Sequence, residues 1–143
     1  MKTLVIVLMT LVMVPFVTAQ TEQFSVEKKS AIVDNLTVGI KSDNTGIRVG
    51  SANVMYDLIE EKYLQSDDAS KSMISLLNML ENGKTEEERI AAAVALYQLG
   101  NSIGIYRLRG VAIYDDNERV SKICKNLYYS YHKLHGTEYF INF

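Results

Sequence analysis

Apolar side chains recur every three or four residues through most of the chain between residues 30 and 135. That spacing places them on one face of an α-helix, and five such stripes can be followed. A further stretch, residues 102–114, fits a helix less regularly because Gly104 and Gly110 each weaken a helix by roughly 1 kcal/mol. Since apolar and polar residues do not alternate over a useful length before the last few residues, the pattern predicts an all-α protein. The five stripes are Ile32, Leu36 and Ile40; Ala52, Tyr56, Ile59 and Tyr63; Met73, Leu76, Leu77 and Leu80; Ile90, Ala93, Val94 and Tyr97; and Val120, Ile123, Cys124, Leu127 and Tyr131.

Polar turns divide these stripes into six expected helices. The turns carry Asp, Asn, Ser, Thr and Gly, the residues that begin or end helices. Thr85 followed by Glu88 forms a capping box. The acidic run at residues 86–88 has the composition of a metal-binding cluster, but three carboxylates in a first helical turn interact favourably with the helix dipole, and we favour that interpretation. The turns lie at residues 43–46, 82–85 and 114–117, a tight joint lies at residues 99–102, and the polar stretch 65–68 makes a longer joint between residues 63 and 70.

The chain contains an internal repeat. When Arg48, Arg89 and Arg119 are placed in register, each follows a polar turn and precedes an aliphatic residue and then a small one. Units of this length are typical of stacked helical hairpins whose apolar faces bury one another. The matching positions are Val49, Ile90 and Val120, then Gly50, Ala91 and Ser121, and, eight residues after each arginine, Tyr56, Tyr97 and Leu127.

Residues 74–80, 88–100 and 103–108 carry a family resemblance. Their sequences are ISLLNML, ERIAAAVALYQLG and IGIYRL, with an arginine at the start of the second helix, an alanine-rich run after it and a Leu-Gly ending. This stretch resembles a HEAT repeat followed by the start of another, and the resemblance extends over about residues 30–135. It implies a short α-α superhelix, or α-solenoid, of about three helical hairpins.

The resemblance also implies an inner ladder of polar contacts between the turn aspartate and the arginine of HEAT-like repeats. The middle repeat has Asn82 and Gly83 in place of the aspartate, so Arg89 is expected to pair elsewhere. The pairs implied for the other repeats are Asp43 with Arg48, and Asp115 or Asp116 with Arg119.

Residues 1–19 have the three-part pattern of a secretory signal peptide, with a lysine near the start, an apolar run over residues 4–17 and small residues before Gln20. The apolar run is shorter than the ~20 residues of a spanning helix. We therefore expect cleavage between Ala19 and Gln20 and export to a periplasmic or extracellular location. A membrane-tethered envelope protein that keeps the segment is the alternative. Residues 20–29 are polar and are expected to form a flexible segment before a repeat domain at residues 30–136.

Composition excludes several classes of protein. The 143-residue chain is 48% hydrophobic and 22% charged, with a formal net charge of −2 and one proline. These values argue against a disordered, a collagen-like or a strongly basic nucleic-acid-binding chain. Cys124 is the only cysteine, so no internal disulfide forms, and its place on an apolar stripe predicts a buried thiol.

Sequence motifs for catalysis are absent. The chain contains no glycine-rich phosphate loop, no Gly-x-Ser-x-Gly elbow, no His-Glu-x-x-His and no paired cysteines. We therefore expect a non-enzymatic protein without a cofactor. His132 and His135, three residues apart on the last helix, offer two metal ligands, which leaves a small accessory enzyme or metal-handling protein as the alternative.

Aromatic residues gather near the C-terminal end, where Tyr139, Ile141 and Phe143 alternate as in an extended segment. We expect this tail to pack back over the last apolar face of the solenoid, and a partner site is the alternative. Since a solenoid offers surface rather than chemistry, we expect a protein or peptide partner, no nucleic acid, and membrane contact only through the signal segment. The candidate binding residues are those of the ladder together with Tyr56, Tyr97, Tyr106, Tyr139, Phe140 and Phe143.

Overall fold

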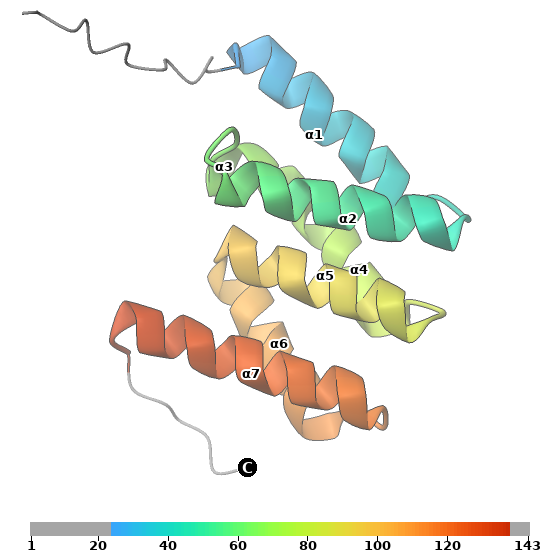
Figure 1. Cartoon of the computed structure of the whole chain (residues 1–143), viewed down its shortest axis with the longest axis vertical. Coiled ribbons are helices and arrows are strands. Elements are labelled where there is room, and N and C mark those ends of the chain that lie inside the picture. The colour runs from blue at the N-terminus through green and yellow to red at the C-terminus, as the bar shows by residue number, and fades with distance from the viewer. Residues whose placement is uncertain (1–23, 138–143) are drawn as a thin grey trace, which may run out of the picture.

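A computed structural model describes residues 24–137, and every regular element in that range is helical (Figure 1). The predicted signal segment, the cleavage site between Ala19 and Gln20, and the tail residues Tyr139, Phe140 and Phe143 lie outside the described residues. The all-α prediction is confirmed for the described part. Its elements are α1 (Val26–Ile40), α2 (Thr45–Glu60), α3 (Ser66–Ala69), the 3-10 helix η1 (Ser70–Ser72), α4 (Met73–Asn82), α5 (Glu86–Leu99), α6 (Ser102–Tyr114) and α7 (Glu118–His135).

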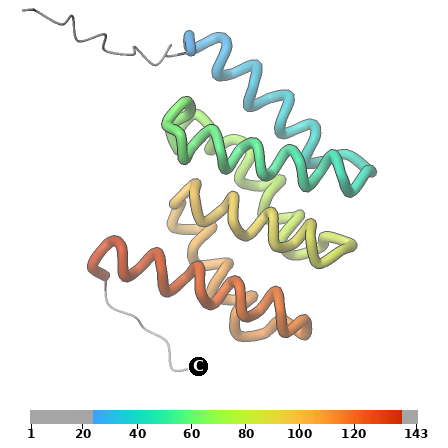
Figure 2. Tube along the Cα trace, in the orientation of Figure 1, coloured from blue at the N-terminus to red at the C-terminus, as the bar shows by residue number. Residues whose placement is uncertain are grey.

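The helices pair into three successive hairpins, α1 with α2, α4 with α5, and α6 with α7. The second helices of these hairpins, α2, α5 and α7, lie side by side in one layer, and Figure 2 shows that they run in the same direction. Helices α4 and α6 lie behind this layer, and α1 packs on α2 at one end of the stack (Figure 1). The N-terminal turns of α2, α5 and α7 therefore share one edge of the layer, and their C-terminal ends share the opposite edge.

A continuous apolar core joins the hairpins. The larger of two clusters of buried side chains extends from Ile40 of α1 through α5 to Tyr128 of α7, and a smaller one lies between α1, α2 and α3. Met73 packs against both clusters. Residues 91–93 are three buried alanines, whose small side chains let neighbouring helices approach α5 closely.

Each helix of the layer begins with a side-chain cap that accepts backbone N–H groups of the first turn. Arg48 and Arg89 follow their caps by four residues, but Arg119 follows its cap by only two. The predicted equivalence of the three arginines is therefore wrong for Arg119, and Tyr129 rather than Leu127 corresponds to the tyrosines of the other helices. Arg119 has sequence neighbours like those of the other two arginines, but the caps define where each helix begins and place it two residues nearer to the helix start. The caps are Asn44, Thr85 and Asn117.

One segment differs from the sequence prediction. Helix α1 begins at Val26, where the Ser25 hydroxyl accepts a hydrogen bond from the Lys28 N–H, so residues 26–29 are helical rather than part of a flexible segment. Phe24, just before this helix, stacks on Tyr63 with the ring centroids 5.3 Å apart. The longer joint predicted between the first two hairpins contains α3 and η1.

Gly39 lies where α1 crosses α2 at close range. A Cβ atom there would lie 2.0 Å from Ser51 Oγ, whereas at Gly50 in α2 it would meet no atom within 4 Å. We expect Gly39→Ala to lower the free energy of unfolding by about 1–3 kcal/mol through overpacking. Gly50→Ala is expected to raise it by up to about 1 kcal/mol, because alanine favours the helix. Urea unfolding measures both values, and equal stability of the two variants would contradict the close α1–α2 contact.

The predicted burial of Cys124 is confirmed. Burial, with a smaller contribution from the Asp115 carboxylate, raises the pKa of Cys124 to about 12. Because the thiolate is the reactive form, we expect the native chain to react with dithionitrobenzoate at least about a hundredfold more slowly than the urea-unfolded chain. Rapid labelling of the native chain would show that Cys124 is accessible and that the contact between α5 and α7 is looser than described.

Candidate functional site

The edge formed by the N-terminal turns of α2, α5 and α7 carries a series of ion pairs. Glu88 lies at the centre of this edge, and its side chain is only 1% exposed. Glu88 Oε2 lies 3.1 Å from Arg48 Nη1 and accepts a hydrogen bond of 2.8 Å from the Lys84 backbone N–H. Glu88 Oε1 accepts a hydrogen bond of 2.7 Å from Thr45 Oγ1. Glu88 therefore ties the first turn of α2 to the first turn of α5.

Opposing effects act on the Glu88 carboxyl. Burial by itself raises its pKa, because a charge is poorly solvated inside the protein. The hydrogen bonds from Thr45 and Lys84 and the positive charge of Arg48 outweigh burial and hold the pKa of Glu88 below its ordinary value. Glu88 is thus a buried carboxylate whose charge is compensated by α2.

Two further pairs connect α5 with α7. Arg89 donates through Nη1 and Nη2 to the two carboxylate oxygens of Asp115, which lies in the turn before α7. Arg119 Nη1 lies 2.5 Å from Glu86 Oε1, and Asn117 Nδ2 donates to the other oxygen of Glu86 at 3.2 Å. The first turn of α5 is therefore linked to the helices on both of its sides.

These pairs differ from the ladder that the HEAT resemblance implies. Each joins one hairpin to the next, and the turn residues Asp43 and Asp116 are exposed and take no part in them. The middle arginine does pair elsewhere, as expected. The observed pairs are Arg48 with Glu88, Arg89 with Asp115, and Arg119 with Glu86, in place of Asp43 with Arg48 and Asp115 or Asp116 with Arg119.

Sequence reasoning missed Glu86 and Glu88 as partners of the arginines, because the acidic run was interpreted only as complementing the helix dipole. The available signal was their spacing. Side chains two residues apart on a helix point in roughly opposite directions, so Glu88 faces α2 and Glu86 faces α7. The side chains of Arg48, Glu88 and Arg89 are largely buried, and each is paired with a residue of a neighbouring hairpin. We therefore infer that these ion pairs stabilise the stack of hairpins.

Ser121 occupies the place in α7 that Arg89 occupies in α5. Arg89 Nε donates to the Leu80 carbonyl at 2.8 Å, and Ser121 Oγ donates to the Ala112 carbonyl at 2.9 Å. In both cases the acceptor lies nine residues earlier, in the first helix of the same hairpin. Arg89 in addition reaches Asp115 of the next hairpin, whereas no hairpin follows Ser121 in the described range.

Tyrosines line both seams of the layer. Tyr56 and Tyr97 each follow their cap by twelve residues and are half-buried. A hydrogen bond with Glu60 is the largest cause that raises the pKa of Tyr56, and Tyr97 is near enough to contribute. Tyr97 in turn meets Tyr131 of α7 edge to face, with ring centroids 6.5 Å apart. The candidates Tyr56 and Tyr97 therefore lie in one row across α2, α5 and α7, whereas Tyr106 is exposed on α6, outside that layer.

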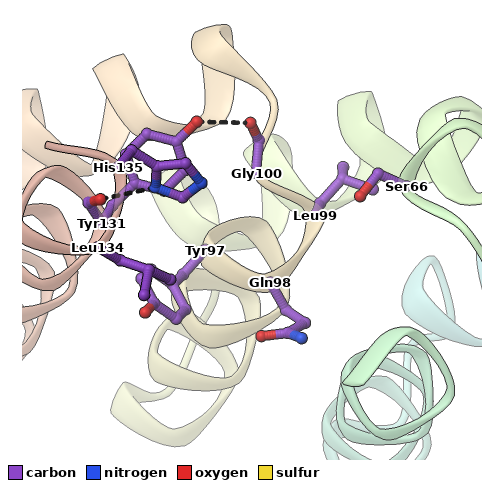
Figure 3. A pocket seen from close by; sticks show the side chains of 8 residues that line it. All are labelled: Ser66, Tyr97, Gln98, Leu99, Gly100, Tyr131, Leu134 and His135. Carbon is purple, nitrogen blue, oxygen red and sulfur yellow. Dashed lines mark hydrogen bonds between the residues drawn. The ribbon is translucent and has the colours of Figure 1, made fainter. Parts of the chain in front are cut away.

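A pocket of about 360 Å³ opens at the C-terminal edge of the layer, between the ends of α5 and α7 and the start of α3 (Figure 3). The Tyr131 hydroxyl donates to the Gly100 carbonyl at 3.1 Å, which holds the ring in place. The His135 ring stacks on Tyr131 with centroids 4.1 Å apart. Leu134 lines the same pocket and is 75% exposed. The remaining polar lining comes from Gln98 and Ser66.

The two histidines proposed as metal ligands are both engaged at the end of α7. His132 Nδ1 contacts Thr137 Oγ1, and its ring lies 4.3 Å from that of Tyr128. His135 Nδ1 lies 2.7 Å from the Tyr131 carbonyl oxygen. Within residues 24–137, no three His, Cys, Asp or Glu side chains are grouped so that they could hold a metal ion. Of the two, His135 contributes its ring to the pocket between α5 and α7.

Comparison of the chain with protein-family models, with curated protein sequences and with solved structures finds no match. Across residues 24–137, none of the helices has the length and apolar character that crossing a membrane requires.

Proposed function

We propose that this chain is a non-enzymatic helical-repeat protein with a HEAT-like α-solenoid architecture that binds a protein or peptide partner. Three stacked hairpins, a parallel layer of second helices and polar links between consecutive units support the repeat architecture. Such stacks present an extended surface rather than a catalytic centre.

The pocket between α5 and α7 is the observation that carries the proposal. It combines the rings of Tyr97, Tyr131 and His135 with an exposed leucine and the amide of Gln98. Tyrosines are enriched at binding surfaces because a rigid apolar ring carries a polar tip. Apolar side chains of an extended peptide fit against the rings, and its backbone groups find hydrogen-bond partners at the rim.

Selection from a random peptide library displayed on phage tests this proposal. We expect enriched peptides to bind the purified chain and to lose at least about tenfold in affinity when Tyr97 is changed to alanine, because a central aromatic anchor carries a large share of binding energy. Leu134→Ala is expected to weaken binding as well, since its side chain is already exposed and its loss leaves the fold intact.

Ile74→Ala supplies the matched control, because Ile74 is 68% exposed on α4, behind the layer. This variant is expected to bind the selected peptides as tightly as the unchanged chain. The proposal fails if no peptide is enriched, or if Ile74→Ala weakens binding as much as Tyr97→Ala does.

We also propose that the chain is exported, on the strength of the signal-like pattern in residues 1–19. Mass spectrometry of the chain recovered outside the cytoplasm is expected to give a mature N-terminus at Gln20. A chain that retains residue 1 and fractionates with membranes would instead support the tethered alternative.

A further inference from the structure

A smaller hollow lies next to the pocket between α5 and α7. It has a volume of about 210 Å³ and lies between the start of α6 and the last turns of α7. Part of its lining is buried, since Ile105 is 4% exposed and Tyr128 is 6% exposed, whereas Tyr106 is 65% exposed. The residues that line it are Ser102, Ile105, Tyr106, Tyr128, Tyr131 and His132.

The ring of Tyr131 separates this hollow from the pocket, because Tyr131 lines both. Its hydroxyl donates to the Gly100 carbonyl at 3.1 Å, which fixes the ring at the joint between α5 and α6 (Figure 3). His135, which lines the pocket, stacks on this ring, and His132, which lines the hollow, meets it edge to face with centroids 5.6 Å apart.

The two depressions are close neighbours. Gly100 lines the pocket, and Ser102, two residues later in the chain, lines the hollow. Two residues span at most about 7 Å. The pocket and the hollow therefore form a pair of adjacent sites with one aromatic ring between them.

Size and charge limit what the hollow can bind. Its 210 Å³ is less than the roughly 300–1,000 Å³ of pockets that enclose a whole small molecule, so it has room for one large side chain. Among the described residues that line the hollow and the pocket, none is Asp, Glu, Lys or Arg. A charged group placed there would lose water without gaining an ionic partner. The hollow is therefore suited to an uncharged aromatic or aliphatic side chain.

We propose that the hollow binds a second large apolar side chain of the same peptide whose first one occupies the pocket. This inference rests on the proposed function and names the class of peptide. Side chains two residues apart in an extended peptide point to the same side and lie about 7 Å apart, which matches the spacing across the joint. The expected partner therefore carries two large apolar residues separated by one residue.

Tyr106 gains a role in this arrangement. It lies outside the layer of α2, α5 and α7, but as part of the hollow it is adjacent to the pocket that contains Tyr97. The candidates Tyr97 and Tyr106 thus belong to one continuous surface, on the two sides of Tyr131.

Peptides selected from the phage library on the full-length chain test the inference. We expect them to share two large apolar residues at positions i and i+2, and alanine at either position to lower the affinity at least about tenfold. Tyr106→Ala is expected to lower it about as much. Tyr114→Ala, at the other end of α6 and 82% exposed, is the matched control and is expected to leave binding unchanged.

A double-mutant cycle assigns each peptide residue to its site. In Tyr106→Ala, alanine at one of the two peptide positions is expected to cost much less than in the unchanged chain, while alanine at the other costs as much as before. Leu134→Ala, in the pocket, is expected to show the reverse. Unfolding in urea, equal for both variants, establishes that neither has lost its fold.

The outcomes separate this inference from the proposed function. If the peptides depend on Tyr97 but Tyr106→Ala binds them like the unchanged chain, the second site is disproved and the proposed function stands. If no peptide is enriched, both are overturned. Binding that reaches the hollow only in a chain ended after Thr137, or only at low protein concentration, would mean that the chain itself or a second copy fills the hollow, which also overturns the inference.

Discussion

Replacing Glu88 with alanine is expected to lower the free energy of unfolding by about 3–5 kcal/mol, as measured by urea denaturation at neutral pH. The reason is that Arg48, of whose side chain 13% is exposed, would keep its charge inside the protein without a carboxylate beside it. Arg48 Nε is already buried without a hydrogen-bond acceptor. Loss of the Glu88 carboxylate would therefore leave the guanidinium charge poorly compensated. Breaking one half of a buried pair costs more than removing both halves.

Two variants make this prediction specific. Glu87→Ala changes an exposed carboxylate in the same helical turn and is expected to cost less than about 1 kcal/mol, the usual size of a helix-dipole contribution. Arg48→Met combined with Glu88→Gln removes both charges and is expected to be more stable than Glu88→Ala alone. If Glu87→Ala and Glu88→Ala cost the same, Glu88 does not join α2 to α5.

The same pair predicts a dependence on pH. The fold lowers the pKa of Glu88, so the ionised carboxylate contributes stability that is fully present above its ordinary value of 4.5 and is lost as the pH falls through the folded value. Glu88→Gln lacks this contribution. Its free energy of unfolding is therefore expected to fall less steeply than that of the unchanged chain when urea denaturation is repeated at pH values below 4.5. Parallel curves would contradict the ionised, buried state of Glu88.

Leu96→Ala is the second substitution with a large expected effect, a loss of about 2–5 kcal/mol in the free energy of unfolding. Leu96 is fully buried in α5, and its Cδ2 lies 3.3 Å from the place where a Cβ of Gly104 in α6 would stand. Leu96 belongs to the core cluster that several helices share, and because such surroundings relax only partly, a cavity remains where the leucine was. Thermal or urea unfolding measures the loss.

Leu134→Ala is the matched control for this substitution, since it removes the same atoms from a side chain that is 75% exposed. Its effect is expected to lie within about 0.5 kcal/mol of zero, as for other surface substitutions. A cost for Leu96→Ala as small as this would contradict the central position of α5 between the other hairpins.

Helix positions were predictable from the sequence because spacing and capping are local. The stripe around Ile90 and the Thr85 cap define α5 without any knowledge of its neighbours, and the apolar surroundings of Cys124 were enough to predict its burial. It was harder to predict which positions of successive hairpins are equivalent. Arg119 matched the other arginines in sequence context, but the cap of α7 lies two residues closer to it, and the turn at residues 114–117 offers more than one residue that could cap the helix.

Contacts between hairpins were the part that sequence could not provide. Tyr97 was identifiable as a candidate from its place in the repeat, but Tyr131, Leu134 and His135 join it only because the end of α7 lies beside the end of α5. The partner of Arg48 was hidden for the same reason, since Glu88 lies forty residues away in the sequence. Such pairings depend on how far each hairpin is rotated against the next, which no local pattern encodes.

Backbone amide chemical shifts of the isotope-labelled chain, recorded while a selected peptide is added, test most directly where the partner binds. The largest shifts are expected around Tyr97, Gly100 and Leu134, at the seam between α5 and α7. Shifts confined to α1 and α4, with the seam unchanged, would show that the partner binds elsewhere.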